Sequence, residues 1–308
     1  SMDWKTDMHS NLWVFPRGMK RNGETGENSL EWTSRYGSVV TSAFEIASTD
    51  GMNEKGLVAN LLWLPETEYP VRDKNKPGLA ITAWVQYMLD NFATVEEAVA
   101  YIDEDTFQVV SDMMPDGSRL ATLHLSISDA TGDCAIFEYI GGKLTVYHSK
   151  EYKVMTNSPT YNKQLALSEY WKSIGGLSFL PGTNRAADRF ARASFYINAL
   201  PETDDERIAV ASVFSVVRNA SVPYGISTPE SPEISTTQWR TVSESKNLRY
   251  FFESSLTPNT FWVNLKDFDL SEGAPVFKLS IANGEMYHGN TAKNFKTALP
   301  FKFMGVKG

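Results

Sequence analysis

The chain has 308 residues, of which 42% are hydrophobic and 12% aromatic, so it carries enough apolar material for a sizeable core. It holds 29 basic and 37 acidic residues, a formal charge of −8, with the two signs interspersed. Nucleic-acid binding needs clustered positive charge to neutralise phosphates, and this class of function is therefore disfavoured. No apolar run reaches the roughly eighteen residues of a membrane-spanning helix.

The cysteine and histidine content argues against two kinds of site, a disulfide framework and a metal centre. The single cysteine, Cys134, excludes an internal disulfide framework and leaves the compartment open between periplasm and cytoplasm. The four histidines show no ligand spacing: His9, His124, His148 and His288. We therefore expect no metal site and no cofactor. No signal-peptide pattern precedes Asp3.

The first hundred residues predict strands followed by helices. Residues 37–49 alternate small, apolar and polar groups and end at Asp50-Gly51, a dipeptide typical of turns. Residues 57–64 are apolar enough for a strand that is buried on both faces. Residues 79–92 carry apolar groups at helical spacing, which predicts a helix over that range.

A second helix is predicted to follow directly, with Thr94 as its N-cap and Glu97 completing a capping box. Apolar segments separated by turn residues then predict consecutive antiparallel hairpin strands at 120–130, 134–140 and 143–149. Helices are predicted at 160–173, 185–199 and 206–219. A Pro- and Ser-rich stretch at 222–237 precedes strands near 238–242, 248–254, 259–265 and 276–281.

The order of these elements indicates the fold class. Hairpin strands, then helices, then further hairpin strands predict an α+β fold with sheets stacked between helical layers, not a parallel βαβ array. No repeat, low-complexity tract or obvious linker divides the sequence. Residues 1–308 are therefore predicted to form one domain.

Four segments, in order along the chain, resemble one known family. They are SMDWKTDMHSNLWVFPRGMKR at 1–21, DGMNEKGL at 50–57, VMTNSPTY at 154–161 and LPGTNRAADRFAR at 180–192. Together they resemble the choloylglycine hydrolase family, which holds the bile salt hydrolases and penicillin V acylases. The resemblance implies the four-layer αββα sandwich of N-terminal nucleophile hydrolases, with two antiparallel sheets between helical layers.

The resemblance also implies a reaction, the hydrolysis of a linear amide. In this family the thiolate of an N-terminal cysteine attacks the substrate carbonyl, with its own α-amine as base, and water releases the acyl-enzyme. The leaving amine would be glycine or taurine from a bile salt, or the β-lactam nucleus of penicillin V. The sequence leaves this choice open because both pockets are apolar and aromatic.

Three residues of this chain match catalytic positions of the family. Asp3 is implied to orient the nucleophile's amine, Asn157 to donate to the oxyanion, and Arg189 to lie beside the nucleophile. Taken alone, these residues read as an exposed carboxylate, a turn-forming amide and a surface ion pair. Arg192 is the alternative if the alignment shifts along the same helix.

Met2, Trp4 and Trp63 are the predicted substrate-binding residues. Trp63 stands where many bile salt hydrolases carry an oxyanion-hole Asn, and strand alternation predicts that Asn60 points to the opposite face. The segment between Asn157 and Arg189 is shorter than in Gram-positive members, which indicates the Gram-negative branch. We expect a homo-oligomer, either a dimer or a tetramer.

The nucleophile itself has no counterpart in this sequence. In the family, the strand that begins with the cysteine precedes the Met-Asp motif, so we expect an in-frame Cys codon about seventeen codons before Met2. Ser1 lies too close to Asp3 to replace it, and Cys134 is expected to be buried and non-catalytic. The chain as given is therefore predicted to be inactive, with a groove beside Asp3. The alternative is a truncated or non-catalytic family member that binds amphipathic ligands.

Overall fold

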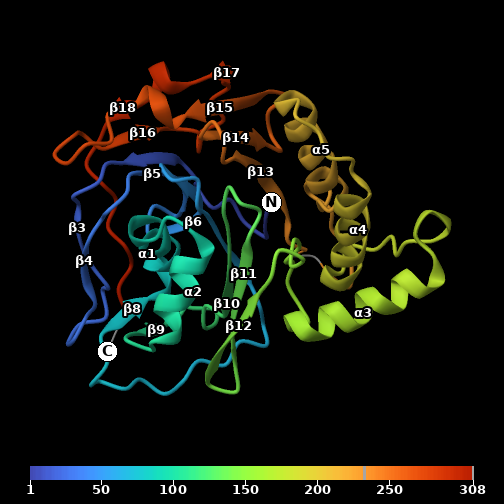
Figure 1. Cartoon of the computed structure of the whole chain (residues 1–308), viewed down its shortest axis with the longest axis horizontal. Coiled ribbons are helices and arrows are strands. Elements are labelled where there is room, and N and C mark those ends of the chain that lie inside the picture. Colours follow the sequence, from blue (N-terminus) through green and yellow to red (C-terminus); the bar gives the residue numbers. More distant parts are fainter. Residues whose placement is uncertain (232–233, 307–308) are drawn as a thin grey trace.

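The structure, a computed structural model, describes residues 1–231 and 234–306, and positions 232–233 of the Pro- and Ser-rich stretch lie outside the described residues. Two large sheets dominate it (Figure 1). The strands of the larger sheet are β2 (Leu12–Phe15), β5 (Ser38–Ala43), β6 (Ala47–Asn53), β7 (Val58–Trp63), β10 (Leu123–Ser128), β11 (Cys134–Ile140), β12 (Lys143–His148), β16 (Phe277–Leu279) and β18 (Lys296–Thr297). They pair in the order β12-β11-β10-β7-β6-β5-β2-β16-β18, each antiparallel to its neighbour.

The second large sheet has five strands, which are β1 (Met2–Trp4), β13 (Thr236–Glu244), β14 (Arg249–Ser254), β15 (Thr260–Asn264) and β17 (Gly289–Asn290). They pair in the order β1-β13-β14-β15-β17, antiparallel except between β15 and β17. Two small sheets join β3 (Lys20–Asn22) to β4 (Glu31–Thr33) and β8 (Gly78–Ala80) to β9 (Gln108–Val110).

The helices cover the outer faces of the two large sheets. They are α1 (Trp84–Asn91), α2 (Val95–Asp103), α3 (Tyr161–Ile174), α4 (Ala186–Ala199) and α5 (Glu206–Asn219), with 3₁₀ turns η1 (Ile81–Ala83), η2 (Gly176–Ser178), η3 (Leu265–Asp267) and η4 (Ala292–Asn294). Helix α1 packs on β5, β6 and β7, whereas α5 packs on β13 and against α4. In Figure 1, α4 and α5 lie on the far side of β13 from α1 and α2.

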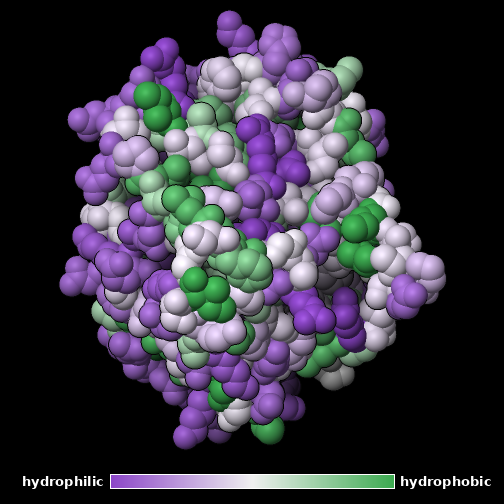
Figure 2. All heavy atoms as spheres, turned by 90° about the vertical axis from the view of Figure 1, so that its right-hand side faces the viewer, coloured by the Kyte–Doolittle hydropathy of each residue, from purple (hydrophilic) through white to green (hydrophobic). Residues whose placement is uncertain are grey.

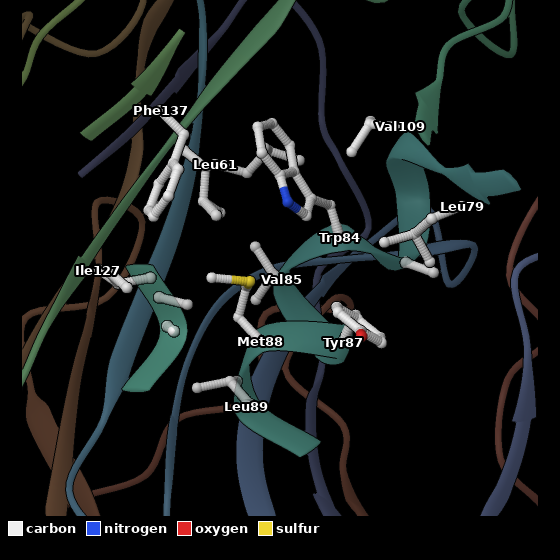
Figure 3. Close-up of a cluster of buried hydrophobic side chains, with 14 of the residues drawn as sticks. Leu61, Leu79, Trp84, Val85, Tyr87, Met88, Leu89, Val109, Ile127 and Phe137 are labelled. Atoms are coloured by element: carbon white, nitrogen blue, oxygen red, sulfur yellow. The ribbon is translucent and has the colours of Figure 1, made fainter. Parts of the chain in front are cut away.

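Strand alternation assigns one hydrophobic core to each face of the nine-stranded sheet. On β2, Trp13 and Phe15 belong to the core under the helices, and Leu12 and Val14 to the core between the sheets. Trp84 lies at the centre of the first core, where Figure 3 shows it between side chains of α1 and of the sheet. The chain thus has four layers, and the predicted α+β fold with two stacked sheets is confirmed.

The two cores also explain the remaining sheet faces. Tyr250 and Phe252 of β14 are buried in the core between the sheets. The alternate residue Phe251 faces outward, where its ring lies 6.4 Å from that of Phe214 on α5. Each face of the five-stranded sheet is therefore covered by apolar groups from a neighbouring layer, as a four-layer sandwich requires.

Most predicted elements appear close to their expected bounds. The hairpin strands β10, β11 and β12 are consecutive and antiparallel, and α3, α4 and α5 match the predicted helices. Thr94 caps α2 by accepting a hydrogen bond from the Glu97 amide at 3.1 Å. The Glu97 carboxylate accepts from the amide of Ala93, one residue earlier than a standard capping box would have it.

Two local predictions were wrong. Asp50 and Gly51 do not form a turn but lie inside β6, and the chain instead turns at Phe44 and Glu45, whose φ angles are 51° and 53°. Gly51 is required because an added Cβ would come within 2.6 Å of the Val39 carbonyl oxygen. The expected helix over 79–92 is divided, since its start pairs with β9 as strand β8 and α1 begins only at Trp84.

Among residues 1–231 and 234–306, no helix is both long enough and apolar enough to cross a membrane.

Candidate functional site

A cavity of about 450 Å³ lies where the two large sheets meet the outer helices α4 and α5. The chain start, the strands β6 and β7, and the hairpin loop 112–115 contribute to its wall. It is bordered by all six predicted site residues: Met2, Asp3, Trp4, Trp63, Asn157 and Arg189. Segments that are far apart in the sequence thus converge on one cavity.

Strand β1 brings the first three of these residues to the cavity. Asp3 lies opposite Thr237 of β13, and the pairing shifts register between Met2 and Asp3. A register shift re-aims side chains that would otherwise alternate strictly, as β-bulges do beside active sites. Among the described residues, β1 is the edge strand of its sheet, so its outer side borders the cavity without a strand partner.

The Arg189 guanidinium holds the polar cluster together. Its Nη1 lies 3.3 Å from Asp3 Oδ2, and its Nη2 donates to Asn157 Oδ1 at 2.7 Å. The other Asp3 oxygen accepts from the Thr237 hydroxyl at 2.6 Å. The planar fork of arginine suits this double contact, because its donors have a fixed geometry. The predicted convergence of Asp3, Asn157 and Arg189 is therefore observed.

Asn157 lies in a turn between β12 and α3 and is held from both ends of its amide. Its oxygen accepts from Arg189, and its Nδ2 donates to the Trp63 carbonyl oxygen at 2.7 Å. An asparagine amide carries two N–H groups, so the second one can donate elsewhere. Because the amide plane is fixed by Arg189 and Trp63, the direction of this second donor is fixed as well.

Burial sets the electrostatics of the cluster. The Arg189 and Asp3 side chains are 11% and 13% exposed. Burial lowers the pKa of the Arg189 guanidinium, and the Asp3 carboxylate partly opposes that shift. The cluster thus places a paired positive charge and an oriented amide at the border of a largely apolar cavity.

Aromatic side chains form the adjacent wall. The rings of Trp4 and Trp63 lie 5.6 Å apart at an interplanar angle of 55°. The guanidinium of Arg119, from the loop above them, lies 4.2 Å from the Trp63 ring centroid and 5.6 Å from that of Trp4. Such a surface suits an apolar or aromatic group of a ligand.

A second buried carboxylate, which the sequence reading missed, lies in the same cavity wall. Asp50 accepts from Tyr250, from Thr241 Oγ1 at 3.1 Å and from Asn60 Nδ2 at 2.5 Å. Burial raises the pKa of Asp50, and the Tyr250 hydrogen bond opposes the rise. Asp50 and Asn60 come from the larger sheet and the other two donors from the smaller one, so the network ties the two sheets together beside the cavity. The sequence pattern assigned Asp50 to a turn. That assignment hid the signal of a carboxylate at a buried strand position.

The other candidate residues have different surroundings. Asn60 also borders the cavity, which the alternation argument did not anticipate. Arg192 is buried and donates to the carbonyl oxygens of Pro181 and Thr183 at 2.7 and 2.8 Å, so it braces the loop before α4. Cys134 is only partly buried and does not border the cavity, and burial raises the pKa of its thiol to about 11. Ser1 does border it.

Within the part of the chain that the structure describes, no group of three or more His, Cys, Asp or Glu side chains is arranged to hold a metal ion.

Comparison with known proteins gives a consistent result. Residues 1–278 match the family described as linear amide C–N hydrolases, choloylglycine hydrolase family. A penicillin V acylase from Pectobacterium atrosepticum is 51% identical over 328 aligned positions, covering 99% of this chain and 87% of the relative. A bile salt hydrolase/transferase from Clostridium perfringens is 28% identical over 251 positions, covering 73% of this chain and 75% of the relative.

Solved structures agree with this relationship. A penicillin V acylase from Agrobacterium tumefaciens superposes with a TM-score of 0.93 at 56% identity, covering 99% of this chain and 95% of that one. A conjugated bile acid hydrolase from Clostridium perfringens gives a TM-score of 0.77 at 23% identity, with 91% of each chain covered. The second likeness supports the fold alone.

Proposed function

This chain belongs to the choloylglycine hydrolase family of linear amide C–N hydrolases, and we propose that it hydrolyses amides of the penicillin V type through a cysteine acyl-enzyme. The observation that carries the proposal is the contact of Arg189 with both Asp3 and Asn157 at the edge of a cavity lined by Trp4 and Trp63. Polar groups that could position an amine and an oxyanion thus lie beside an aromatic wall that could hold an acyl group.

The reaction assigns a role to each polar residue. A cysteine thiolate attacks the amide carbon, and the negative charge that develops on the carbonyl oxygen is stabilised by the free N–H of Asn157. The C–N bond then breaks, and the leaving nitrogen takes a proton from the nucleophile's ammonium. Water, deprotonated by the same amine, hydrolyses the thioester and regenerates the thiol. Asp3 orients that amine, and Arg189 fixes Asp3 relative to Asn157.

We propose that the nucleophile is the first residue of a strand that pairs with the open side of β1. Two observations support this placement. The outer side of β1 borders the cavity, and an edge strand offers unpaired backbone groups to a neighbour. Cys134, the single cysteine of the sequence, does not border the cavity. In this proposal the chain of 308 residues alone is inactive.

Penicillin V is proposed as the preferred substrate over conjugated bile salts. The relatives named penicillin V acylase are 51% and 56% identical to this chain, against 28% for the bile salt hydrolase/transferase. The paired tryptophans also suit the flat phenoxy ring of penicillin V, because aromatic pairs add attraction beyond area burial.

The test is a substrate panel on protein that carries its nucleophile strand. Release of the free amine from penicillin V, glycocholate and taurocholate is followed at equal enzyme concentration. We expect kcat/KM for penicillin V to exceed that for either bile salt at least tenfold, a difference of about 1.4 kcal/mol. A preference for a bile salt would overturn the substrate assignment. No turnover of any amide would favour the alternative, a family member that binds amphipathic ligands without cleaving them.

We also propose that the chain self-associates as a dimer or tetramer. Support comes from large apolar side chains exposed at the end of α3 and on η2, where Leu177 is 93%, Tyr170 59% and Phe179 53% exposed. Figure 2 looks onto the side of the molecule that carries α3, α4 and α5, and shows hydrophobic groups scattered among hydrophilic ones. Light scattering should give a mass above the 34.5 kDa of one chain, and Leu177→Glu should lower that mass if this surface is the interface.

A further inference from the structure

His124 is a fully buried histidine whose two ring nitrogens both face hydrogen-bond acceptors. Its Nδ1 lies 2.9 Å from Glu138 Oε1, and its Nε2 lies 2.9 Å from the backbone oxygen of Thr156. The side chains of His124 and Glu138 are 1% and 0% exposed. A neutral imidazole has one N–H and one bare nitrogen, so it can satisfy only one of these two acceptors. An ionised Glu138 has no proton to donate. In that case both contacts are hydrogen bonds only when the ring carries two protons.

The Glu138 carboxylate also has a donor on its other side, at the start of α3. Its two carboxylate oxygens accept from the backbone amide of Tyr161 at 3.1 and 3.0 Å. Tyr161 is the first residue of α3, and Thr160 in the N-cap position contributes no side-chain hydrogen bond to the helix start. The carboxylate therefore replaces the missing cap at the positive end of a helix dipole, which stabilises a negative charge. Hydrogen bonds from backbone amides favour the charged form of a carboxyl for the same reason.

We infer that His124 and Glu138 form a buried imidazolium–carboxylate pair whose task is to position Asn157. The imidazolium holds the carbonyl of Thr156, the residue directly before Asn157, and the carboxylate holds the first turn of α3 after it. The pair thus fixes the Asn157 turn from both sides and ties it to the adjacent strands β10 and β11. His124 and Glu138 do not border the cavity, so they are positioning residues and not catalytic ones.

Other residues also contact the Asn157 turn. Gln164 of α3 donates to the Asn157 carbonyl oxygen at 2.7 Å and to the Thr156 hydroxyl at 3.0 Å. These neutral bonds hold the turn to α3 but not to the sheet. The Trp63 carbonyl that accepts from Asn157 belongs to the sheet. The Asn157 amide therefore keeps its direction only if the turn stays fixed relative to the sheet. The His124–Thr156 bond supplies that second anchor.

The protonation state can be read directly, without any activity, from the chain with ¹⁵N-labelled histidine rings. Single variants His9→Gln, His148→Gln and His288→Gln identify the remaining signal as that of His124, so His124 itself is left intact. We expect both ring nitrogens of His124 to show the protonated signature at pH 7. One bare ring nitrogen at that pH would overturn the inference.

The positioning role is tested by Glu138→Gln, with Asp133→Asn as the matched control. Asp133 pairs with His148 at 2.7 Å on the same hairpin, but neither residue contacts the Asn157 turn. In the 308-residue chain, we expect the side-chain amide signals of Asn157 to shift or broaden in Glu138→Gln and to stay unchanged in Asp133→Asn. His124→Gln, which keeps one donor for Thr156, is a second variant should Glu138→Gln fail to fold. Unchanged Asn157 signals in every folded variant would contradict the role.

Kinetics then separate this inference from the proposed function, on which its catalytic consequence rests. In protein carrying the nucleophile strand, Glu138→Gln should lower kcat about ten- to a hundredfold, because small displacements of a catalytic group cost that much. KM should change less than about threefold, since the acyl pocket is untouched. Equal losses in Asp133→Asn would contradict the inference. An inactive wild-type enzyme would overturn the proposed function and leave the ring-nitrogen result standing.

Discussion

Among the residues that the structure describes, two arginine–aspartate pairs are largely buried, and their surroundings differ. Arg189 and Asp3 meet at the cavity, whereas Arg21 and Asp90 lie under the helical layer with side chains 6% and 0% exposed. Asp90 accepts from Trp32 at 2.8 Å and from Gln86 at 2.7 Å. The two pairs have the same chemistry, but only one of them leaves polar groups facing a space that a ligand can enter.

The surroundings of Arg21 complete the contrast. Its guanidinium lies 4.6 Å from the Phe15 ring centroid and 5.6 Å from that of Phe303, so aromatic faces take the place of a cavity. Burial lowers the pKa of Arg21 and raises that of Asp90, and in each case the partner opposes the shift. A buried ion pair is therefore not in itself a sign of function. What distinguishes the two pairs is the cavity, which Asp3 and Arg189 border and Arg21 and Asp90 do not.

The largest effect should come from breaking the structural pair. Asp90→Ala leaves the Arg21 charge buried without its partner, so we expect the free energy of unfolding to fall by about 3–5 kcal/mol. Urea unfolding measures this. Glu169→Ala is the control, because Glu169 pairs with Lys172 at the surface and its loss should cost less than about 1 kcal/mol. Similar losses in the two variants would contradict the distinction.

The cluster of Asp3, Asn157 and Arg189 at the cavity should respond in the opposite way. Asn157→Ala removes the proposed oxyanion donor, so kcat of the enzyme with its nucleophile strand should fall about 10²- to 10³-fold. The unfolding free energy should fall by about 1–3 kcal/mol, since two hydrogen bonds are lost and each contributes about 1 kcal/mol net. Asn162→Ala, on the exposed side of α3 and outside the cavity wall, should leave kcat unchanged. A normal kcat in Asn157→Ala would remove Asn157 from the mechanism.

The sequence predicted the cluster at the cavity better than the Arg21–Asp90 pair. Asp3, Asn157 and Arg189 lie in motifs that match a family, so their meeting could be anticipated. Arg21 ends the first of these motifs, but nothing in the sequence signals its contact with Asp90, because that pairing depends on how α1 packs. The helices α3, α4 and α5 could be predicted from local periodicity, which needs no knowledge of distant segments.

The turn predicted at Asp50-Gly51 was wrong for physical reasons. Asp50-Gly51 has the composition of a turn, but here Gly51 serves the close approach of β5 and α1, and Asp50 is satisfied by donors from another sheet. The true turn uses Phe44 and Glu45, residue types that rarely adopt positive φ and so give no local signal. Contacts between sheets decide both positions, and a sequence window does not contain them.

Asp50 gives a pH-dependent test of that network. Because its pKa is raised in the folded state, the folded protein keeps a proton that the unfolded chain loses above about pH 4. The free energy of unfolding should therefore fall as pH rises from there through the folded pKa, by up to about 1.4 kcal/mol per pH unit relative to Asp50→Asn. Unfolding of both proteins across that range measures the difference. A difference that stays constant or grows with pH would show that burial does not control this carboxyl.

The smallest effect is expected at the aromatic wall. Trp63→Leu removes the ring that faces Trp4, so KM for penicillin V should rise about threefold to tenfold, as the loss of one aromatic contact predicts. Trp262→Leu on β15, away from the cavity, is the control and should leave KM unchanged. Equal effects of the two substitutions would argue against an acyl pocket at Trp4 and Trp63.

The central claim is that Asp3, Asn157 and Arg189 serve a cysteine nucleophile carried on a strand beside β1. Intact-mass and peptide analysis of protein mixed with penicillin V tests it most directly, with the 308-residue chain and a form that carries the strand compared in parallel. We predict a phenoxyacetyl adduct on the first residue of the longer form and neither adduct nor turnover in the 308-residue chain. An adduct on Cys134 or Ser1, or turnover by the 308-residue chain, would contradict the account.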